Sequence, residues 1–188
     1  MKRGLGMTAL LGALSLAACS GLSSSPGWGL VVDFMLANPE VKDKTGVQGV
    51  SDAGRRLFAS EYLTPKGGGI AALVAEALPE TVRVTWREDT ETGRHFTTGR
   101  VVADHVVKVR ERIPQAVLDY ASAQRGRALR LLFRIKDDGV WFGWDVEETV
   151  HHPAGGSGLV YSMRGGDVPC YDQPPQVRQF RAQFGDNG

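Results

Sequence analysis

The stretch "ALRLLFRIKDDGVWFGWDVEE", residues 128–148, consists of two runs of alternating apolar residues joined by Asp-Gly. Alternation with a period of two is typical of a β-strand with one buried face. Asp-Gly between two such runs favours a two-residue hairpin turn of type I′, which needs a positive φ at both central residues. We therefore predict a hairpin that turns at Asp138-Gly139. This register forms the centre of the core from three pairs: Ile135 opposite Phe142, Phe133 opposite Trp144, and Leu131 opposite Val146.

The other face of the predicted hairpin carries charged residues and one tryptophan. The same register sets Arg130 against Glu147 and Lys136 against Trp141, and both contacts are mildly favourable. Tryptophan and arginine are enriched in protein interfaces, so Trp141, Arg134 and Lys136 are candidate partner-binding residues. The alternative is that a helix or a second sheet covers this face.

Three further segments show the strand pattern. They are "WGLVVDFML" (28–36), "TVRVTWRED" (81–89) and "RHFTTGRVVADHVVKVRERIP" (94–114). In the last of these a bend or bulge is expected near Gly99. The residues expected to point inward are Val82, Val84 and Trp86 in the second segment, and Val101, Ala103, His105, Val107 and Val109 in the third.

One helix is expected between the third segment and the hairpin. It begins near Pro114, ends before Gly126, and buries Val117, Leu118, Tyr120 and Ala121. Residues 52–59 could form a helical turn or the start of a strand, and "GIAALVAEALPE" (69–80) could form a second helix. The fold class predicted from these elements is mainly β (α+β): an antiparallel sheet or sandwich with one or two short helices.

The predicted domain organisation is a single β-rich domain, residues 28–172, since a chain of 188 residues fits one core. After Thr149 the chain should be rich in loops. Residues 173–188 are expected to be a C-terminal tail with a short helical stretch around 177–184.

The N-terminus reads as a targeting segment. Lys2 and Arg3 precede a short apolar stretch that is smaller than the roughly 20 residues of a membrane span, so residues 1–18 are predicted to be a signal peptide. Its end, Leu16-Ala17-Ala18-Cys19, resembles the lipobox of bacterial lipoproteins. In that motif the cysteine is acylated and becomes the new N-terminus. The alternative is an ordinary secretory signal with a chance cysteine.

Acylation of Cys19 has two consequences. Residues 19–27 would be a lipidated N-terminus and polar tether, and Ser20 after the cysteine resembles the sorting signal for the outer membrane. The expected location is therefore the periplasmic face of the outer membrane, with membrane contact through the lipid on Cys19. Cys170, the second of two cysteines, would have no partner for an intramolecular disulfide, and a buried thiol is expected there.

Charge and motifs argue against several functions. Without residues 1–18 the chain has 20 basic and 21 acidic residues, interspersed throughout, and this disfavours nucleic-acid binding. Gly155-Gly156-Ser157-Gly158 lacks the glycine that a nucleophile elbow requires two residues after its serine, and Gly67-Gly68-Gly69 lacks the Lys of a phosphate loop. The four histidines lack metal-ligand spacing: His95 should be exposed, His105 a core residue, and His151 and His152 a surface pair. Since these motifs are missing, we expect no enzyme activity, cofactor or metal.

A resemblance to a known group rests on an ordered set of motifs. The lipobox is followed by "VQGVSDAGRRLFASEYLTPKGGG" (47–69) and by Leu78-Pro79-Glu80 running into "VRVTW" (82–86). This arrangement resembles small proteobacterial lipoproteins encoded beside type VI secretion phospholipase effectors. The chain departs from that group in having Glu76-Ala77 where paired cysteines are expected, so the resemblance does not identify the effector.

The resemblance implies an immunity protein whose partner is a secreted lipase effector. Such a lipoprotein would bind the toxin at the membrane and neutralise it before it reaches phospholipid. Two alternatives remain: a structural or assembly lipoprotein of a cell-envelope machine, and a hydrolase in which Ser157 would be the nucleophile.

Overall fold

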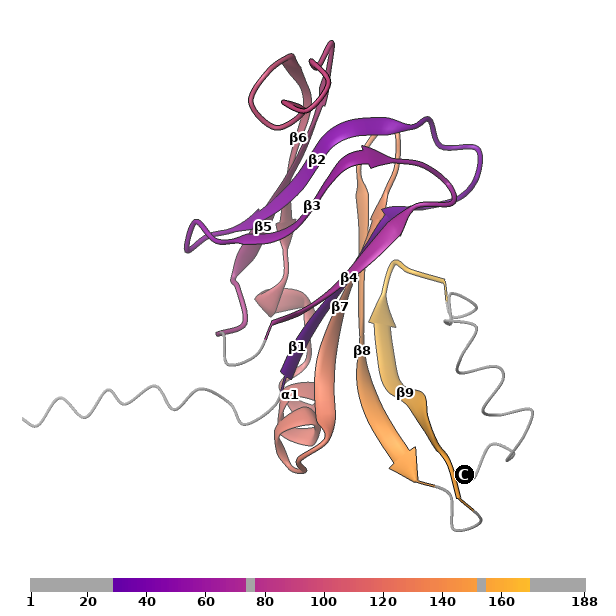
Figure 1. The fold of residues 1–188 in the computed structure, drawn as a ribbon. Helices are drawn as coiled ribbons and strands as arrows, with labels where there is room; N and C mark the ends of the chain where they lie inside the picture. The colour runs from indigo at the N-terminus through magenta and orange to yellow at the C-terminus, as the bar shows by residue number, and fades with distance from the viewer. Residues whose placement is uncertain (1–28, 74–76, 152–154, 170–188) are drawn as a thin grey trace, which may run out of the picture.

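The computed structural model describes residues 29–73, 77–151 and 155–169 of the chain (Figure 1). Within these ranges it consists of strands, one α-helix and one 3₁₀ helix. The elements in order are β1 (Gly29–Leu36), β2 (Lys44–Ser51), β3 (Arg56–Leu63), β4 (Gly68–Leu73), β5 (Thr81–Glu88), β6 (Arg100–Lys108), η1 (Arg110–Arg112), α1 (Gln115–Ser122), β7 (Arg127–Ile135), β8 (Val140–His151) and β9 (Ser157–Gly166).

The strands form two sheets, and the predicted mainly β fold with a short helix is confirmed. The five-stranded sheet has the order β4-β1-β7-β8-β9, and the four-stranded sheet has the order β3-β2-β5-β6. One pairing departs from the antiparallel prediction: β1 runs parallel to β7, so the five-stranded sheet is mixed.

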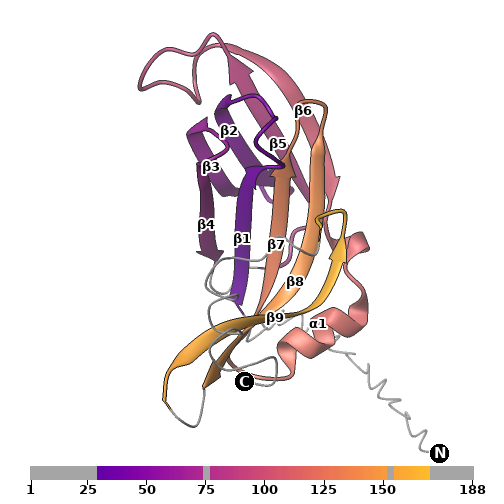
Figure 2. The ribbon, with the colours of Figure 1, turned by 90° about the vertical axis from the view of Figure 1, so that its right-hand side faces the viewer.

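A single hydrophobic cluster draws its residues from both sheets and from α1. In Figure 1 the four-stranded sheet and α1 lie on the same side of the five-stranded sheet, one above the other, and Figure 2 views that sheet from its other side. A row of aromatic rings joins the two layers. The ring centres of Phe34 and Phe58 are 4.7 Å apart, those of Phe58 and Phe133 are 5.1 Å apart, and those of Phe133 and Phe142 are 5.3 Å apart.

The β7–β8 hairpin exists as predicted, but its turn lies one residue earlier. Phe133 pairs with Phe142 and Arg134 with Trp141, and the Lys136 N–H donates to the Gly139 carbonyl (2.9 Å), so Asp137 and Asp138 occupy the turn. Gly139 does not have the positive φ of a type I′ turn. The predicted pairings were therefore wrong by two positions along the partner strand. Because two is the period of the strand, every side chain still lies on its predicted face.

Strands β5 and β6 follow the predicted pattern with one reversal. Val82, Val84 and Trp86 are buried as expected. In β6 the pairing shifts between Trp86 and Arg87, where Val102 is the extra residue of a bulge. The bulge turns Val102 toward the core and leaves Val101 exposed, so the prediction for Val101 was wrong.

The segment predicted as a second helix begins as a strand. Residues 68–73 form β4 and pair antiparallel with β1. Gly69 allows this close pairing, since a Cβ there would lie 2.5 Å from the ring of Phe34. Long-range pairing thus outweighs the helical propensity of Ala71 and Ala72.

The remaining predictions have mixed outcomes. Helix α1 lies where it was expected, and residues 56–63 form strand β3, which settles the alternative left open for 52–59. The region after Thr149 is not loop-rich throughout, because β9 pairs with β8 there. Residues 1–28, which include Cys19 and the tether, and residues 170–188, which include Cys170 and the tail, lie outside the described part of the chain. Within the described part, no helix has the length and apolar character needed to cross a membrane.

Candidate functional site

Two of the three predicted partner-binding residues lie at the tip of the β7–β8 hairpin. Trp141 is half-buried on the outer face of the five-stranded sheet. The Lys136 ammonium lies 5.2 Å from the centre of its ring and 2.9 Å from the Asp138 carboxylate. The tip thus presents a tryptophan, a cation and an anion together.

The third residue, Arg134, is buried, and its prediction as a surface contact was wrong. Its side chain is 3% exposed, and its guanidinium donates to a carboxylate oxygen of Asp33 (2.9 Å). The alternation of β7 correctly placed Arg134 beside Trp141 but does not reveal that β1, on its other side, supplies a carboxylate. An arginine at this depth needs such a partner, because an unpaired buried charge is strongly destabilising.

Arg134 belongs to a group of four buried charges on the outer face of the five-stranded sheet, here called the charge network. Its members are Asp33, Arg130, Arg134 and Asp145. Arg130 donates to Asp33 (3.0 Å) and makes two bonds to Asp145 (2.9 and 2.6 Å). The ring of Tyr161 lies 3.9 Å from the Arg130 guanidinium, and burial raises the pKa of the Tyr161 hydroxyl. The network is internally neutral and has a structural role.

A polar hollow of about 540 Å³ adjoins the hairpin tip, and we call it the tip cleft. Its lining is mixed in charge, so it suits a polar protein surface better than a simple anion or cation. The residues that line it are Lys42, Asp43, Lys44, Thr45, Tyr62, Trp86, Arg87, Glu88, Asp89, Val102 and Asp137.

Lys44 joins the tip cleft to the hairpin turn. Its ammonium forms an ion pair with Asp137, donates to the Lys42 carbonyl (2.8 Å), and lies 5.9 Å from the centre of the Trp86 ring. The hydrogen bond from Lys44 lowers the pKa of the Asp137 carboxyl. This long-range ion pair holds Asp137 in the turn and gives a physical reason why the turn does not form at Asp138-Gly139.

Tyr62 is the most exposed aromatic side chain of the cleft, with 58% of its surface accessible. Its hydroxyl donates to Asp43 (3.0 Å), and this hydrogen bond raises the pKa of the hydroxyl. Arg87 donates through Nη1 to the Gly99 carbonyl (2.9 Å), whereas its buried Nε has no hydrogen-bond partner in the described structure. The cleft thus offers an exposed aromatic ring, whereas the Arg87 Nε lies buried beneath its surface.

The tip cleft lies at the opposite end of the five-stranded sheet from the start of the described chain. Because β1 and β7 are parallel, Gly29 pairs with Ala128 at one end and Leu36 with Ile135, next to the tip, at the other. Eight residues of strand separate these ends by about 25 Å. A tether attached before Gly29 would therefore leave the tip cleft facing away from the attachment point.

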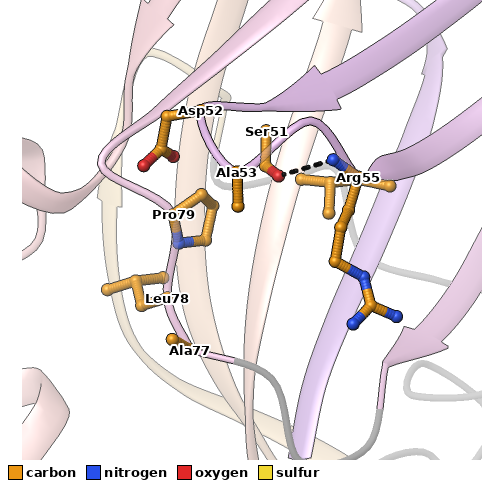
Figure 3. Close-up of a pocket in the computed structure, with 8 residues that line it drawn as sticks. Ser51, Asp52, Ala53, Arg55, Ala77, Leu78 and Pro79 are labelled. Carbon is orange, nitrogen blue, oxygen red and sulfur yellow. Dashed lines mark hydrogen bonds between the residues drawn. The ribbon is translucent and has the colours of Figure 1, made fainter.

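A second hollow, of about 290 Å³, lies between the β2–β3 turn and the segment that leads into β5 (Figure 3). Ser51 and Asp52 line one side, and Leu78 and Pro79 line the other. The Asp52 carboxylate accepts hydrogen bonds from the main-chain N–H groups of Glu80 (3.0 Å) and Thr81 (3.3 Å). These bonds join the two sequence motifs on which the resemblance rests, and the hollow is the gap between them.

The glycine cluster and Trp86, which also belong to the motifs of the resemblance, have structural roles. The glycine cluster allows β4 to lie against Phe34, and Trp86 is buried between Lys44 and His105, whose ring centre is 5.2 Å away. His105 was predicted to be a core residue, and in this contact it is half-buried. These residues support the fold, and Lys44 and Trp86 also line the tip cleft.

The serine considered as a nucleophile is exposed at the first position of β9. Ser157 pairs with His151 across the β8–β9 strands, and both side chains are exposed. No hydrogen bond joins them within the described residues. His95, predicted to be exposed, is half-buried, with its Nδ1 2.8 Å from the Thr90 hydroxyl. Among the described residues, no group of three or more His, Cys, Asp or Glu side chains could hold a metal ion.

No protein-family profile, curated protein or solved structure matches this chain. Its function must therefore be argued from its own residues.

The sequence predicted Trp141 and Lys136 as contacts but none of the residues that line the cleft. Lys44 and Tyr62 belong to two strands that pair with each other, and Asp137 lies some 90 residues along the chain. The charged run Lys42-Asp43-Lys44 before a strand was a signal that could have drawn attention to this end of the sheet.

Proposed function

We propose that this chain is a lipid-anchored protein on the periplasmic face of the outer membrane. It binds a type VI secretion phospholipase effector and neutralises it, and thus acts as a non-catalytic immunity protein. Lipidation of Cys19 is part of this proposal. The class of partner comes from the resemblance, and the contact surface comes from the geometry of the hairpin tip.

The observation that carries the proposal is the position of the tip cleft relative to the anchor. Nine residues lie between Cys19 and Gly29, and the ten residue steps from one to the other can span at most about 35 Å. The tip cleft lies a further strand length away, beyond Leu36. A domain held in this way presents the cleft to the periplasm, where an incoming toxin would meet it before it reaches phospholipid.

The chemistry of the tip suits protein recognition. Trp141 is a half-buried ring on the outer face of the hairpin tip, flanked by the opposite charges of Lys136 and Asp138. Tyr62 is an exposed ring in the lining of the neighbouring tip cleft. Aromatic residues at the centre of a contact, with charged residues around them, commonly dominate binding energy. Seated on the entrance of a lipase active site, this surface would exclude the phospholipid substrate.

The test is protection of cells that carry the proposed phospholipase effector in their periplasm. We expect the wild-type lipoprotein to restore growth and to co-purify with the phospholipase, and the variant Trp141→Ala/Lys136→Glu to lose both properties. Arg125→Glu is the matched control, because it reverses an exposed basic residue near the other end of the sheet, next to Gly126. Retention of binding by the tip variant would exclude the tip as the contact surface.

Two other results would exclude the proposed function itself. If the wild-type chain neither binds the phospholipase nor protects from it, but co-purifies with envelope components, it is an assembly lipoprotein. If the purified chain hydrolyses an ester and Ser157→Ala abolishes that activity, it is an enzyme.

A further inference from the structure

Strand β6 forms one edge of the four-stranded sheet. It pairs with β5 on one side, and no described strand pairs with it on the other (Figure 2). An edge strand presents a row of main-chain N–H and C=O groups that another strand can pair with.

The hydrogen-bond pattern identifies which groups of β6 face outward. Val109 donates its N–H to the Glu80 carbonyl (2.9 Å), and this pair continues the register of β5 and β6. In an antiparallel pair, hydrogen-bonded positions alternate, so Val107 and His105 also bond to β5. The main-chain groups of Asp104, Val106 and Lys108 therefore point to the open edge.

A groove lies along the open edge of β6. This shallow groove of about 420 Å³ is bounded by residues 104–108, Arg112 and Val140. Val106, at the middle of this edge, is 64% exposed.

The side chains along this edge are complementary to themselves. Asp104 and Lys108 lie two residues before and two residues after Val106, and all three point to the same face of the sheet. If a second β6 pairs antiparallel about Val106, each Asp104 lies opposite the Lys108 of the other copy, and the two valines meet. The same register pairs all the outward main-chain groups of the three residues.

We propose that two copies of this chain associate through their β6 edges, with Val106 on the two-fold axis. The occupant of the edge is then a second copy of this chain, and the two four-stranded sheets become one continuous sheet. In the single chain Asp104 binds Arg83 and Lys108 binds Glu111 at exposed positions. The Asp104 carboxylate can accept from Lys108 of the second copy while it keeps Arg83, since it has two oxygens.

Disulfide trapping tests the pairing in the full chain. The variant is Val106→Cys in a Cys170→Ser background, expressed with its own signal so that it reaches an oxidising compartment. Opposed hydrogen-bonded residues have Cα atoms about 5.5 Å apart, within the range of a disulfide. Val101→Cys is the matched control, because the same register holds the two copies of residue 101 about 30 Å apart although Val101 is also exposed.

We expect at least about tenfold more covalent dimer from Val106→Cys than from Val101→Cys. Charge reversal makes the test specific. Asp104→Lys or Lys108→Asp alone should reduce trapping at residue 106, because like charges then face each other, and the double reversal should restore it. Because no effector is needed, the result does not depend on the partner named in the proposed function.

Three results would overturn the inference: equal trapping at residues 101 and 106, no restoration by the double reversal, or trapping of residue 106 to a different protein. The last result would assign the edge to that protein.

Discussion

At the scale of single residues, the charge network is the feature that most constrains the fold. Arg130 is 2% exposed and bonds to carboxylates on both neighbouring strands, Asp33 of β1 and Asp145 of β8. It therefore fixes the lateral positions of three strands. Removing one partner would leave a buried charge uncompensated, which costs far more than loss of an exposed pair.

Asp145→Ala should lower the free energy of unfolding by about 3 to 5 kcal/mol, because Arg130 keeps its charge at a buried site. The control is Asp104→Ala, which removes an exposed partner of Arg83 and should cause a much smaller decrease. Urea denaturation of the two variants measures the difference. Equal decreases would show that burial does not set the strength of these pairs.

Tyr161 should make the protein less stable at alkaline pH. Burial raises the pKa of its hydroxyl in the folded state, whereas the unfolded chain titrates near 10. As the pH rises above about 10, the unfolded state loses this proton while the folded state keeps it, so the free energy of unfolding falls. Tyr161→Phe should reduce that fall and keep the ring on Arg130. Denaturation curves with the same pH dependence in both proteins would contradict this account.

At the scale of elements, a strand can be predicted from the sequence when its own side chains alternate between apolar and polar. It cannot be predicted when its structure depends on a partner strand far away in the sequence. The hairpin, β5 and α1 are recognisable from their own residues. Strand β4 is not, because its pairing with β1 depends on Gly69 and Phe34 meeting across the sheet. The turn is misplaced by one residue for a similar reason, since the partner of Asp137 is Lys44, which lies far away in the sequence.

The position of the turn can be tested at Gly139, with Gly126 as the comparison. Gly139 and Gly126 both have open space where a Cβ would be, but only Gly126 has a positive φ (+92°). Gly126→Ala should therefore lower the free energy of unfolding by about 1 to 2 kcal/mol, whereas Gly139→Ala should be neutral or slightly stabilising. Thermal or urea unfolding of the two variants provides the comparison. A large loss in Gly139→Ala would favour the type I′ turn that the sequence suggests.

At the scale of the whole molecule, the proposed function depends on the long direction of the five-stranded sheet, which separates the proposed anchor from the proposed contact surface. The start of β1 marks the end nearest the proposed anchor, and the tip of the β7–β8 hairpin marks the far end. The sequence predicted Trp141 and Lys136 as contacts, and both lie at the far end. It could not predict the neighbouring cleft, because the residues of the cleft come from β2, β3, β5, β6 and the turn. The partner-binding proposal belongs to this assembled surface rather than to any single motif.

The central claim is that this surface neutralises a phospholipase, and the most direct measurement is a titration of that enzyme. The proposed phospholipase effector is purified and mixed with increasing amounts of the mature chain, and phospholipid hydrolysis is followed. The account predicts that activity falls to the baseline as the two proteins reach a fixed molar ratio, and that Trp141→Ala/Lys136→Glu leaves the activity intact while Arg125→Glu inhibits like the wild type. Full phospholipase activity in a large excess of the wild-type chain would contradict it.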